Sequence, residues 1–174
     1  MEGFSGRTQE RVLLGLLDYL GFLTFRLPGW DESSESPKQF LKSGSGFYVS
    51  SNIVLTSYHV VEGCKEVLLD NVGTSIFATD SATDLALLNA PERDAYLTIS
   101  SDEISKGATV IAMGYPIQDL GSPNLVITSG SVSALTGPSG DSRLIQFTAP
   151  IQPGSSGGPI LLASNEVAGV VTGT

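Results

Sequence analysis

The chain is poor in the residues on which disulfide frameworks and metal sites depend. Its 174 residues include one cysteine, Cys64, and one histidine, His59. A single cysteine excludes an intramolecular disulfide, and a zinc site would lack most of its usual ligands. We therefore expect no metal and no organic cofactor, and we expect Cys64 to pack as a small apolar side chain.

Positive charge is also scarce. Nine Lys and Arg residues stand against 18 Asp and Glu residues, which gives a formal net charge of −9. An acidic surface repels phosphate backbones, and this argues against nucleic acid as a partner.

No apolar stretch is long enough to cross a membrane. Residues 12–25 are rich in Leu and Phe, but Asp18 interrupts them and the stretch is shorter than a bilayer span. The acidic residues Glu2, Glu10 and Asp18 also argue against a secretory signal, which would begin with basic residues. We therefore expect no integral membrane segment and no signal peptide, and the compartment stays open.

Glycine and β-branched residues are abundant. The 20 glycines and the many Val, Ile and Thr residues favour short strands joined by tight turns, and thus an all-β fold. We predict a short helix over 8–19, a strand over 20–27 and a polar loop over 28–43, then two groups of strands joined by a polar connection over 91–105. The predicted strands are 44–49, 52–56, 66–69, 74–79 and 84–89 in the first group, and 108–113, 124–135, 143–149, 158–163 and 166–172 in the second.

Glycines surround Ser156 in the stretch GSSGGP, residues 154–159. A serine hydroxyl is a poor nucleophile at neutral pH, so it needs a base to take its proton and donors to hold the oxyanion that follows. Flanking glycines let the backbone turn sharply and bring its N–H groups close to a substrate carbonyl. The stretch indicates a nucleophile loop, although a glycine-flanked serine alone is also typical of an ordinary turn.

His59 and Asp84 are the residues that would activate Ser156. His59 follows the apolar run 53–56, and Asp84 precedes the run Leu-Ala-Leu-Leu. The order His, Asp, Ser is that of chymotrypsin-like folds and differs from the subtilisin and α/β-hydrolase orders. Asp80 is the alternative acid, but no such apolar run follows it.

Three stretches in this order resemble the trypsin-like serine peptidases, and specifically the HtrA/Deg branch. They are GSGFYVSSNIVLTSYHVV over 44–61, ATDLALL over 82–88 and QFTAPIQPGSSGGPIL over 146–161. The resemblance implies two six-stranded antiparallel β-barrels with the site between them, and no PDZ domain. The N-terminal segment and first barrel would occupy 1–98, and the second barrel 99–174.

The resemblance also implies a role for each residue. Ser156 would attack the scissile carbonyl, His59 would accept and return its proton, and Asp84 would orient the imidazole. The backbone N–H groups of Gly154 and Ser156 would form the oxyanion hole. The implied function is a serine endopeptidase whose substrates are unfolded or extended polypeptide segments.

In this family, residues before the nucleophile and on the following strand line the specificity pocket. The matching positions here are Ile151, Val171 and Thr172. None of them is acidic, so we expect cleavage after small or medium apolar residues.

Two positions depart from the family's pattern. Ser155 stands where secreted trypsins have an aspartate that pairs with a new N-terminus, so we expect other contacts to order the loop, ligand or subunit binding among them. The sequence ends at Thr174, before the last strand and helix usual in the family, so we expect either a fragment of a longer protein or a shortened second barrel that something else completes. The resemblance also implies a homo-oligomer, a trimer with contacts through the N-terminal segment.

Two alternatives stay open. One is a latent or non-catalytic binding scaffold, because the fold can persist with a distorted oxyanion hole. The other is a protease domain of a larger protein that acts on one specific partner or on its own chain.

Overall fold

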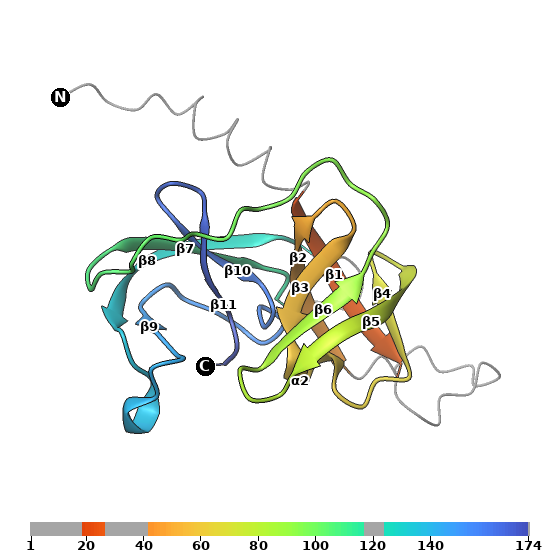
Figure 1. The fold of residues 1–174 in the computed structure, drawn as a ribbon, viewed down its shortest axis with the longest axis horizontal. Coiled ribbons are helices and arrows are strands. Elements are labelled where there is room, and N and C mark those ends of the chain that lie inside the picture. Colours follow the sequence, from red (N-terminus) through yellow and green to blue (C-terminus); the bar gives the residue numbers. More distant parts are fainter. Residues whose placement is uncertain (1–18, 27–41, 117–123, 174) are drawn as a thin grey trace.

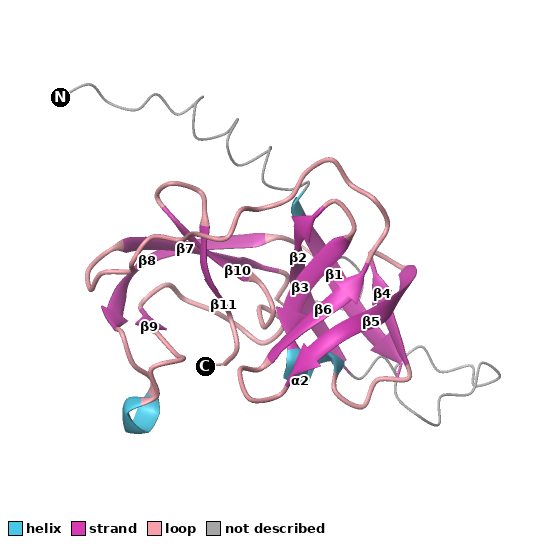
Figure 2. Cartoon of the chain, viewed as in Figure 1, coloured by secondary structure: helices cyan, strands magenta, loops and turns pink. Residues whose placement is uncertain are grey.

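The computed structural model describes residues 19–26, 42–116 and 124–173. Strands dominate it, and they form two curled sheets that lie side by side (Figures 1 and 2). The first sheet is a closed barrel in the order β1-β2-β3-β6-β5-β4, and the second is a five-stranded sheet in the order β11-β10-β7-β8-β9. The predicted all-β, two-barrel architecture is therefore confirmed.

All strand pairs of the first barrel are antiparallel. The sequence predicted each of its strands, but it placed Lys42 and Ser43 in the polar loop 28–43. They belong to a strand because Lys42 pairs with Phe25 and Ser43 pairs with Thr24. The rest of that loop, up to residue 41, lies outside the described residues. The strands are β1 (Leu20–Arg26), β2 (Lys42–Ser50), β3 (Ile53–Ser57), β4 (Glu66–Leu69), β5 (Val72–Asp80) and β6 (Leu85–Asn89).

The second sheet has five strands in the described residues, and β9 and β11 are its edges. The prediction for β9, 143–149, was too long. The register between β8 and β9 shifts between Val132 and Ala134, and Leu144 donates its N–H to Asp141 in a turn before the strand begins. The strands are β7 (Thr109–Gly114), β8 (Val126–Ala134), β9 (Gln146–Phe147), β10 (Pro159–Leu162) and β11 (Val167–Val170).

Helices contribute little to the described fold. The four-residue helix α2 (Tyr58–Val61) follows β3, and its sequence gave no periodic signal. The predicted helix over 8–19 falls almost wholly outside the described residues. No helix within the described ranges is long and apolar enough to span a bilayer. The division of the chain between residues 98 and 99 stays a prediction.

Apolar side chains fill each sheet and also the space between them. One cluster lies inside the first barrel and another inside the second sheet. A third cluster joins the two, because Phe47 and Leu55 of the first barrel pack with Met113 and Leu161 of the second sheet. This shared core fixes the position of one sheet against the other, and therefore the junction between them.

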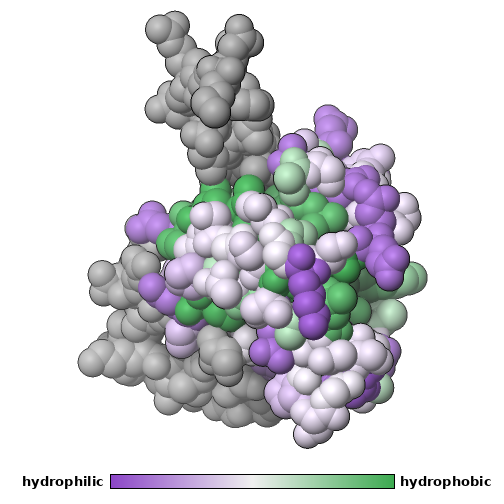
Figure 3. Space-filling model, turned by 90° about the vertical axis from the view of Figure 1, so that its left-hand side faces the viewer, coloured by the Kyte–Doolittle hydropathy of each residue, from purple (hydrophilic) through white to green (hydrophobic). Residues whose placement is uncertain are grey.

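Some apolar side chains stay on the surface. On the face seen from the side of the second sheet, apolar residues are interspersed with polar and charged ones (Figure 3). In the first barrel, Phe77 is 61% exposed, and it lies where the register between β5 and β6 shifts. The shift turns this side chain away from the barrel interior.

The barrel core predicts a clear difference between two leucines. Leu88 is fully buried in the first barrel, whereas Leu135, just after β8, is 37% exposed. We expect Leu88→Ala to lower the free energy of unfolding by about 2–5 kcal/mol, because it removes contacts and leaves a cavity. Leu135→Ala is the matched control and should cost about 1 kcal/mol or less. Urea unfolding measures both, and equal losses would contradict this account of the core.

Candidate active site

His59 lies in the first turn of α2, at the junction between the two sheets. Its ring nitrogen Nδ1 lies 2.7 Å from Oδ2 of Asp84, and its backbone N–H donates to Oδ1 of the same carboxylate over 2.8 Å. The carboxylate therefore holds both the ring and the backbone of His59. One aspartate fixes the orientation of the imidazole through two hydrogen bonds.

Asp84 sits in the turn between β5 and β6, one residue before the strand in which we had placed it. Its φ is 56°, a left-handed conformation that aspartate tolerates better than most residues. Its carbonyl accepts the N–H of Tyr58 over 3.0 Å, so both its backbone and its side chain bond the start of α2. These bonds satisfy N–H groups that a helix start leaves without intrahelical partners.

Asp80, the alternative acid, points into its own turn. Its carboxylate accepts the N–H of Ala82 over 2.9 Å and the hydroxyl of Thr83 over 2.8 Å. The hydrogen bonds from Thr83 and then from Ala82 lower the pKa of Asp80. The geometry thus places Asp84, not Asp80, against the imidazole.

The loop before Ser156 begins with a tight turn. Ser155 donates its N–H to the carbonyl of Gln152 over 2.9 Å, with Pro153 and Gly154 at the two central positions. Gly154 has a φ of 97°, which identifies a type II turn with proline and glycine at their preferred places. The sequence Gln-Pro-Gly-Ser therefore determines the shape of the loop.

Ser45, on β2 of the first barrel, holds this loop in place. Its N–H donates to the carbonyl of Ser156 over 2.8 Å, and its hydroxyl donates to the carbonyl of Gly154 over 2.8 Å. The same hydroxyl accepts the N–H of Tyr115 over 2.8 Å. Ser45 is completely buried, so these bonds form away from water. Nothing in the local sequence predicts this role of Ser45, because a serine between two glycines suits many turns.

The loop of Ser156 and the helix of His59 both lie close to Gly44. A Cβ atom at Gly44 would be 2.6 Å from Cγ1 of Val60 and 3.2 Å from the carbonyl oxygen of Ser156. Val60 is the residue after His59, so the backbone of Ser156 lies close to α2. The fold thus places the backbone of Ser156 near the helix that carries His59, the residue that Asp84 bonds.

Two backbone N–H groups in the loop of Ser156 have no acceptor among the described residues. Within the described part of the chain, neither Gly154 nor Ser156 donates its N–H to another residue, whereas Ser155 and Gly157 both do.

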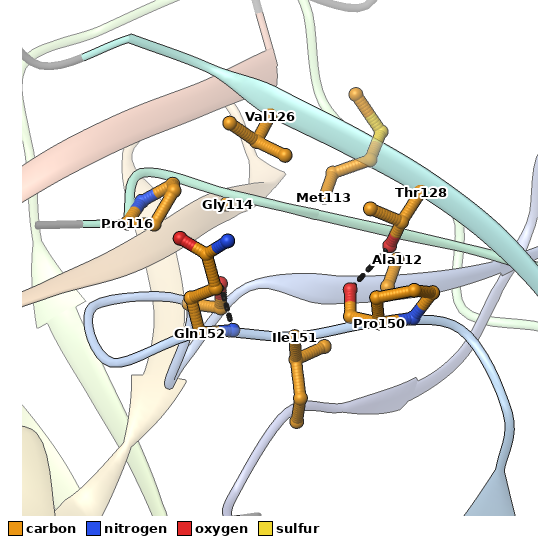
Figure 4. A pocket seen from close by; sticks show the side chains of 10 residues that line it. Ala112, Met113, Gly114, Pro116, Val126, Thr128, Pro150, Ile151 and Gln152 are labelled. Carbon is orange, nitrogen blue, oxygen red and sulfur yellow. Dashed lines mark hydrogen bonds between the residues drawn. The ribbon is translucent and has the colours of Figure 1, made fainter. Parts of the chain in front are cut away.

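A small pocket of about 40 Å³ lies between the loop and the paired strands β7 and β8 (Figure 4). Ser155 lines it and is 7% exposed, with its hydroxyl oxygen 3.5 Å from the N–H of Gln152. In Figure 4 the side chain of Gln152 points toward Gly114, and that of Ile151 points the opposite way. In this structure the turn and Ser45 order the loop, with no carboxylate at position 155.

Ile151 and Thr172 line a second, larger cavity of about 480 Å³. Its other walls include Leu144, Ile145 and Phe147. Val171, which we had grouped with them, does not line it, because its side chain is 2% exposed and packs in the core of the second sheet.

The backbone carbonyl of Val171 instead accepts hydrogen bonds at the junction between the two sheets. This oxygen accepts the N–H of Gly157 over 2.7 Å and the hydroxyl of Ser57 over 2.9 Å. Ser57 precedes α2 but makes no side-chain cap for it. Its hydroxyl ties the first barrel to the second sheet instead.

The described residues contain no group of three or more His, Cys, Asp or Glu side chains that could hold a metal ion. Cys64 is partly buried and packs against the apolar cluster of the first barrel.

Comparison with known proteins points to one family. Residues 44–170 match the trypsin-like peptidase domain. The chain is 31% identical over 190 residues to a "Probable periplasmic serine endoprotease DegP-like" of Rickettsia prowazekii, which covers 97% of this chain and 36% of that protein. It is 34% identical over 164 residues to the "Serine protease Do-like HtrA" of Lactobacillus helveticus, which covers 82% of this chain and 39% of that protein.

The fold has a close counterpart among solved structures. The Rv3671c protease of M. tuberculosis, in its active form, superposes with a TM-score of 0.74 at 24% identity, covering 100% of this chain and 78% of that one. The chain spans less than half the length of the two curated relatives.

The close packing around the loop predicts that Gly157 tolerates no side chain. Its φ is +85°, and a Cβ there would overlap the carbonyl oxygen of Ser45 and the hydroxyl of Thr56. In Gly157→Ala, the left-handed φ costs about 1–2 kcal/mol, and overpacking adds about 1–3 kcal/mol. Gly107→Ala is the matched control, because Gly107 has a φ of +82° but no described atom within 4 Å of such a Cβ. Urea unfolding compares them, and equal losses would show that the loop is not packed as described.

Proposed function

Because the chain belongs to the family of trypsin-like peptidase domains, we propose that it is a serine endopeptidase of HtrA/Deg type that cuts unfolded or extended polypeptides. The observation that carries the proposal is the two-point hydrogen bonding of His59 by Asp84, beside the loop of Ser156 that Ser45 holds. Ser156 is the nucleophile, His59 the general base and Asp84 the orienting acid.

The hydrogen bond between Asp84 and Nδ1 determines what the imidazole does. With the proton on Nδ1, the other ring nitrogen carries the lone pair and accepts the proton of the Ser156 hydroxyl as it attacks the carbonyl. The imidazolium then donates that proton to the leaving amine, and an acyl-enzyme forms. Water, activated by the same nitrogen, releases the acid product and restores Ser156.

The oxyanion hole consists of the N–H groups of Gly154 and Ser156. The type II turn at Gly154 and the absence of acceptors within the described chain support this assignment. When the carbonyl oxygen of the scissile peptide becomes negatively charged, it would accept a hydrogen bond from each of these N–H groups. Each such donor contributes about 2.7–4 kcal/mol to transition-state stabilisation in enzymes where one has been removed.

The cavity of Ile151 and Thr172 is the proposed specificity pocket. None of the residues described along its wall is acidic, and Leu144, Ile145 and Phe147 make the wall apolar. It therefore favours small or medium apolar side chains. Substrates would lie extended along the backbone that follows β11, an edge strand, and pair with it through main-chain hydrogen bonds.

A homotrimer assembled through the N-terminal segment stays a prediction. The segment before Tyr19 lies outside the described residues, so the described fold does not bear on this assembly.

Casein cleavage tests the nucleophile. We expect the wild-type chain to degrade casein and Ser156→Ala to lose at least about 10³-fold of that activity, because the residues of a triad act as a unit. Ser164→Ala, in the exposed turn between β10 and β11, is the matched control and should cleave at the wild-type rate. Unchanged cleavage by Ser156→Ala would contradict the assignment. A wild-type chain that labels with a serine-directed probe but leaves casein intact would favour the partner-specific alternative.

A peptide library tests the pocket. We expect Val, Ala or Leu on the N-terminal side of the cut, because the wall of the cavity is apolar. Ile151→Phe should shift this preference toward Ala, since the larger ring reduces the cavity volume. A preference for Lys or Arg in the wild-type chain would overturn the proposed pocket.

A further inference from the structure

Arg143, just before β9 in the second sheet, is held by a neighbouring carboxylate. Its Nε donates to Oδ1 of Asp141 over 3.0 Å, and its Nη2 donates to Oδ2 over 2.7 Å. This two-pronged pair fixes the plane of the guanidinium. The remaining nitrogen, Nη1, is thereby directed away from Asp141 and donates to the carbonyl of Ala82.

Ala82 lies in the first barrel, in the turn that ends with Asp84. Asp80 holds the same turn from within, through the N–H of Ala82 and the hydroxyl of Thr83. Both backbone polar groups of Ala82 are therefore engaged, one by its own barrel and the other by Arg143. A residue of the second sheet is thus hydrogen-bonded to the turn, two residues before Asp84.

The hydrogen bond between Arg143 and Ala82 joins the two halves of the proposed active site. His59 and Asp84 belong to the first barrel, whereas Ser156 lies in a loop of the second sheet. Ser45 and Ser57 join the two halves on the side of the nucleophile loop. Arg143 joins them at the turn of Asp84.

We propose that Arg143, oriented by Asp141, is a positioning residue that ties the turn 80–84 to the second sheet. It thereby keeps Asp84 and His59 in the geometry that Ser156 requires. This inference rests on the proposed function, since it assigns Arg143 to the same site.

The pair that orients Arg143 stays ionised throughout the pH range in which an imidazole base titrates. Hydrogen bonds from the Arg143 side chain lower the pKa of Asp141 to about 2. A carboxylate with a lowered pKa loses its partner only as the pH falls toward that value. The ion pair between Asp141 and Arg143 is therefore present on both the acid and the alkaline limb of a pH–rate profile. Asp141 does not titrate in that range, so a change in the profile of a variant does not come from protonation of Asp141.

The test is the rate of labelling by a small fluorophosphonate, measured against pH in wild type, Arg143→Gln and Asp141→Asn. Positioning predicts that both variants lower the plateau rate, by about 3- to 10-fold, because a small misplacement of reacting groups is costly. The double variant should be no slower than the slower single variant, since the two residues act as one unit. Arg143→Lys, which keeps the charge but loses the fork, should be slowed as well.

The two single variants also separate positioning from a simple effect of charge. Arg143→Gln removes a positive charge near Asp84, whereas Asp141→Asn removes a negative one. A charge effect alone would move the midpoint of the acid limb upward in the first and downward in the second, with an unchanged plateau. That pattern would overturn the inference.

Arg93 provides the matched control. It donates to Asp70 over 2.7 Å and to the carbonyl of Leu20 over 3.2 Å, so it also joins a carboxylate and a backbone oxygen. Asp70 precedes β5 and Asp84 follows it, so the two contacts lie at opposite ends of the barrel. Arg93→Gln should lower thermal stability without lowering the labelling rate.

The outcomes distinguish failure of the inference from failure of the proposed function. If wild type labels and both Arg143→Gln and Asp141→Asn label at its rate, Arg143 has no positioning role and the proposed function stands. If wild type does not label at any pH, the proposed function fails and the inference fails with it. Thermal unfolding is recorded for every variant, and if Arg143→Gln does not fold, the rate of Arg143→Lys decides.

Discussion

The junction of the two sheets depends on one buried serine. Ser45 donates its N–H to Ser156 and its hydroxyl to Gly154, while accepting the N–H of Tyr115. No water competes for these bonds, because Ser45 is fully buried. A residue of the first barrel thus fixes the two carbonyls on either side of Ser155, and with them the direction of the neighbouring N–H groups.

The rest of the site follows from that constraint. With the loop held, Gly154 adopts the left-handed conformation of its turn, and the N–H groups of Gly154 and Ser156 stay unpaired within the described chain. The first barrel contributes His59 and Asp84 to the same junction through α2. Position 155 holds a serine and no carboxylate, and the hydrogen bonds to the loop come from Ser45 on a strand of the other sheet.

Much of this could be predicted from the sequence. The strands were predictable because alternating apolar residues and turn signals recur along the chain, and the glycines around Ser156 indicated a loop that only they permit. The helix α2 was not predictable, because its four residues are too few to show a helical periodicity of apolar residues. The short β9 depends on a register shift that arises only when β8 pairs with it.

Long-range contacts were the part that sequence reasoning could not reach. Ser45 meets Gly154 across 109 residues, and Arg143 meets Ala82 across 61. A serine between two glycines suits many turns, and nothing local distinguishes Arg143 from other surface arginines. Only the fold shows that both cross from one sheet to the other, at the two sides of the proposed triad.

The most direct test of the central claim is intact-mass analysis after incubation with a fluorophosphonate, beside a Ser156→Ala variant. The account predicts one adduct per wild-type chain and none on the variant, which would show a formed and activated nucleophile. A wild-type chain that gains no mass, or a variant that gains the same mass, would contradict it.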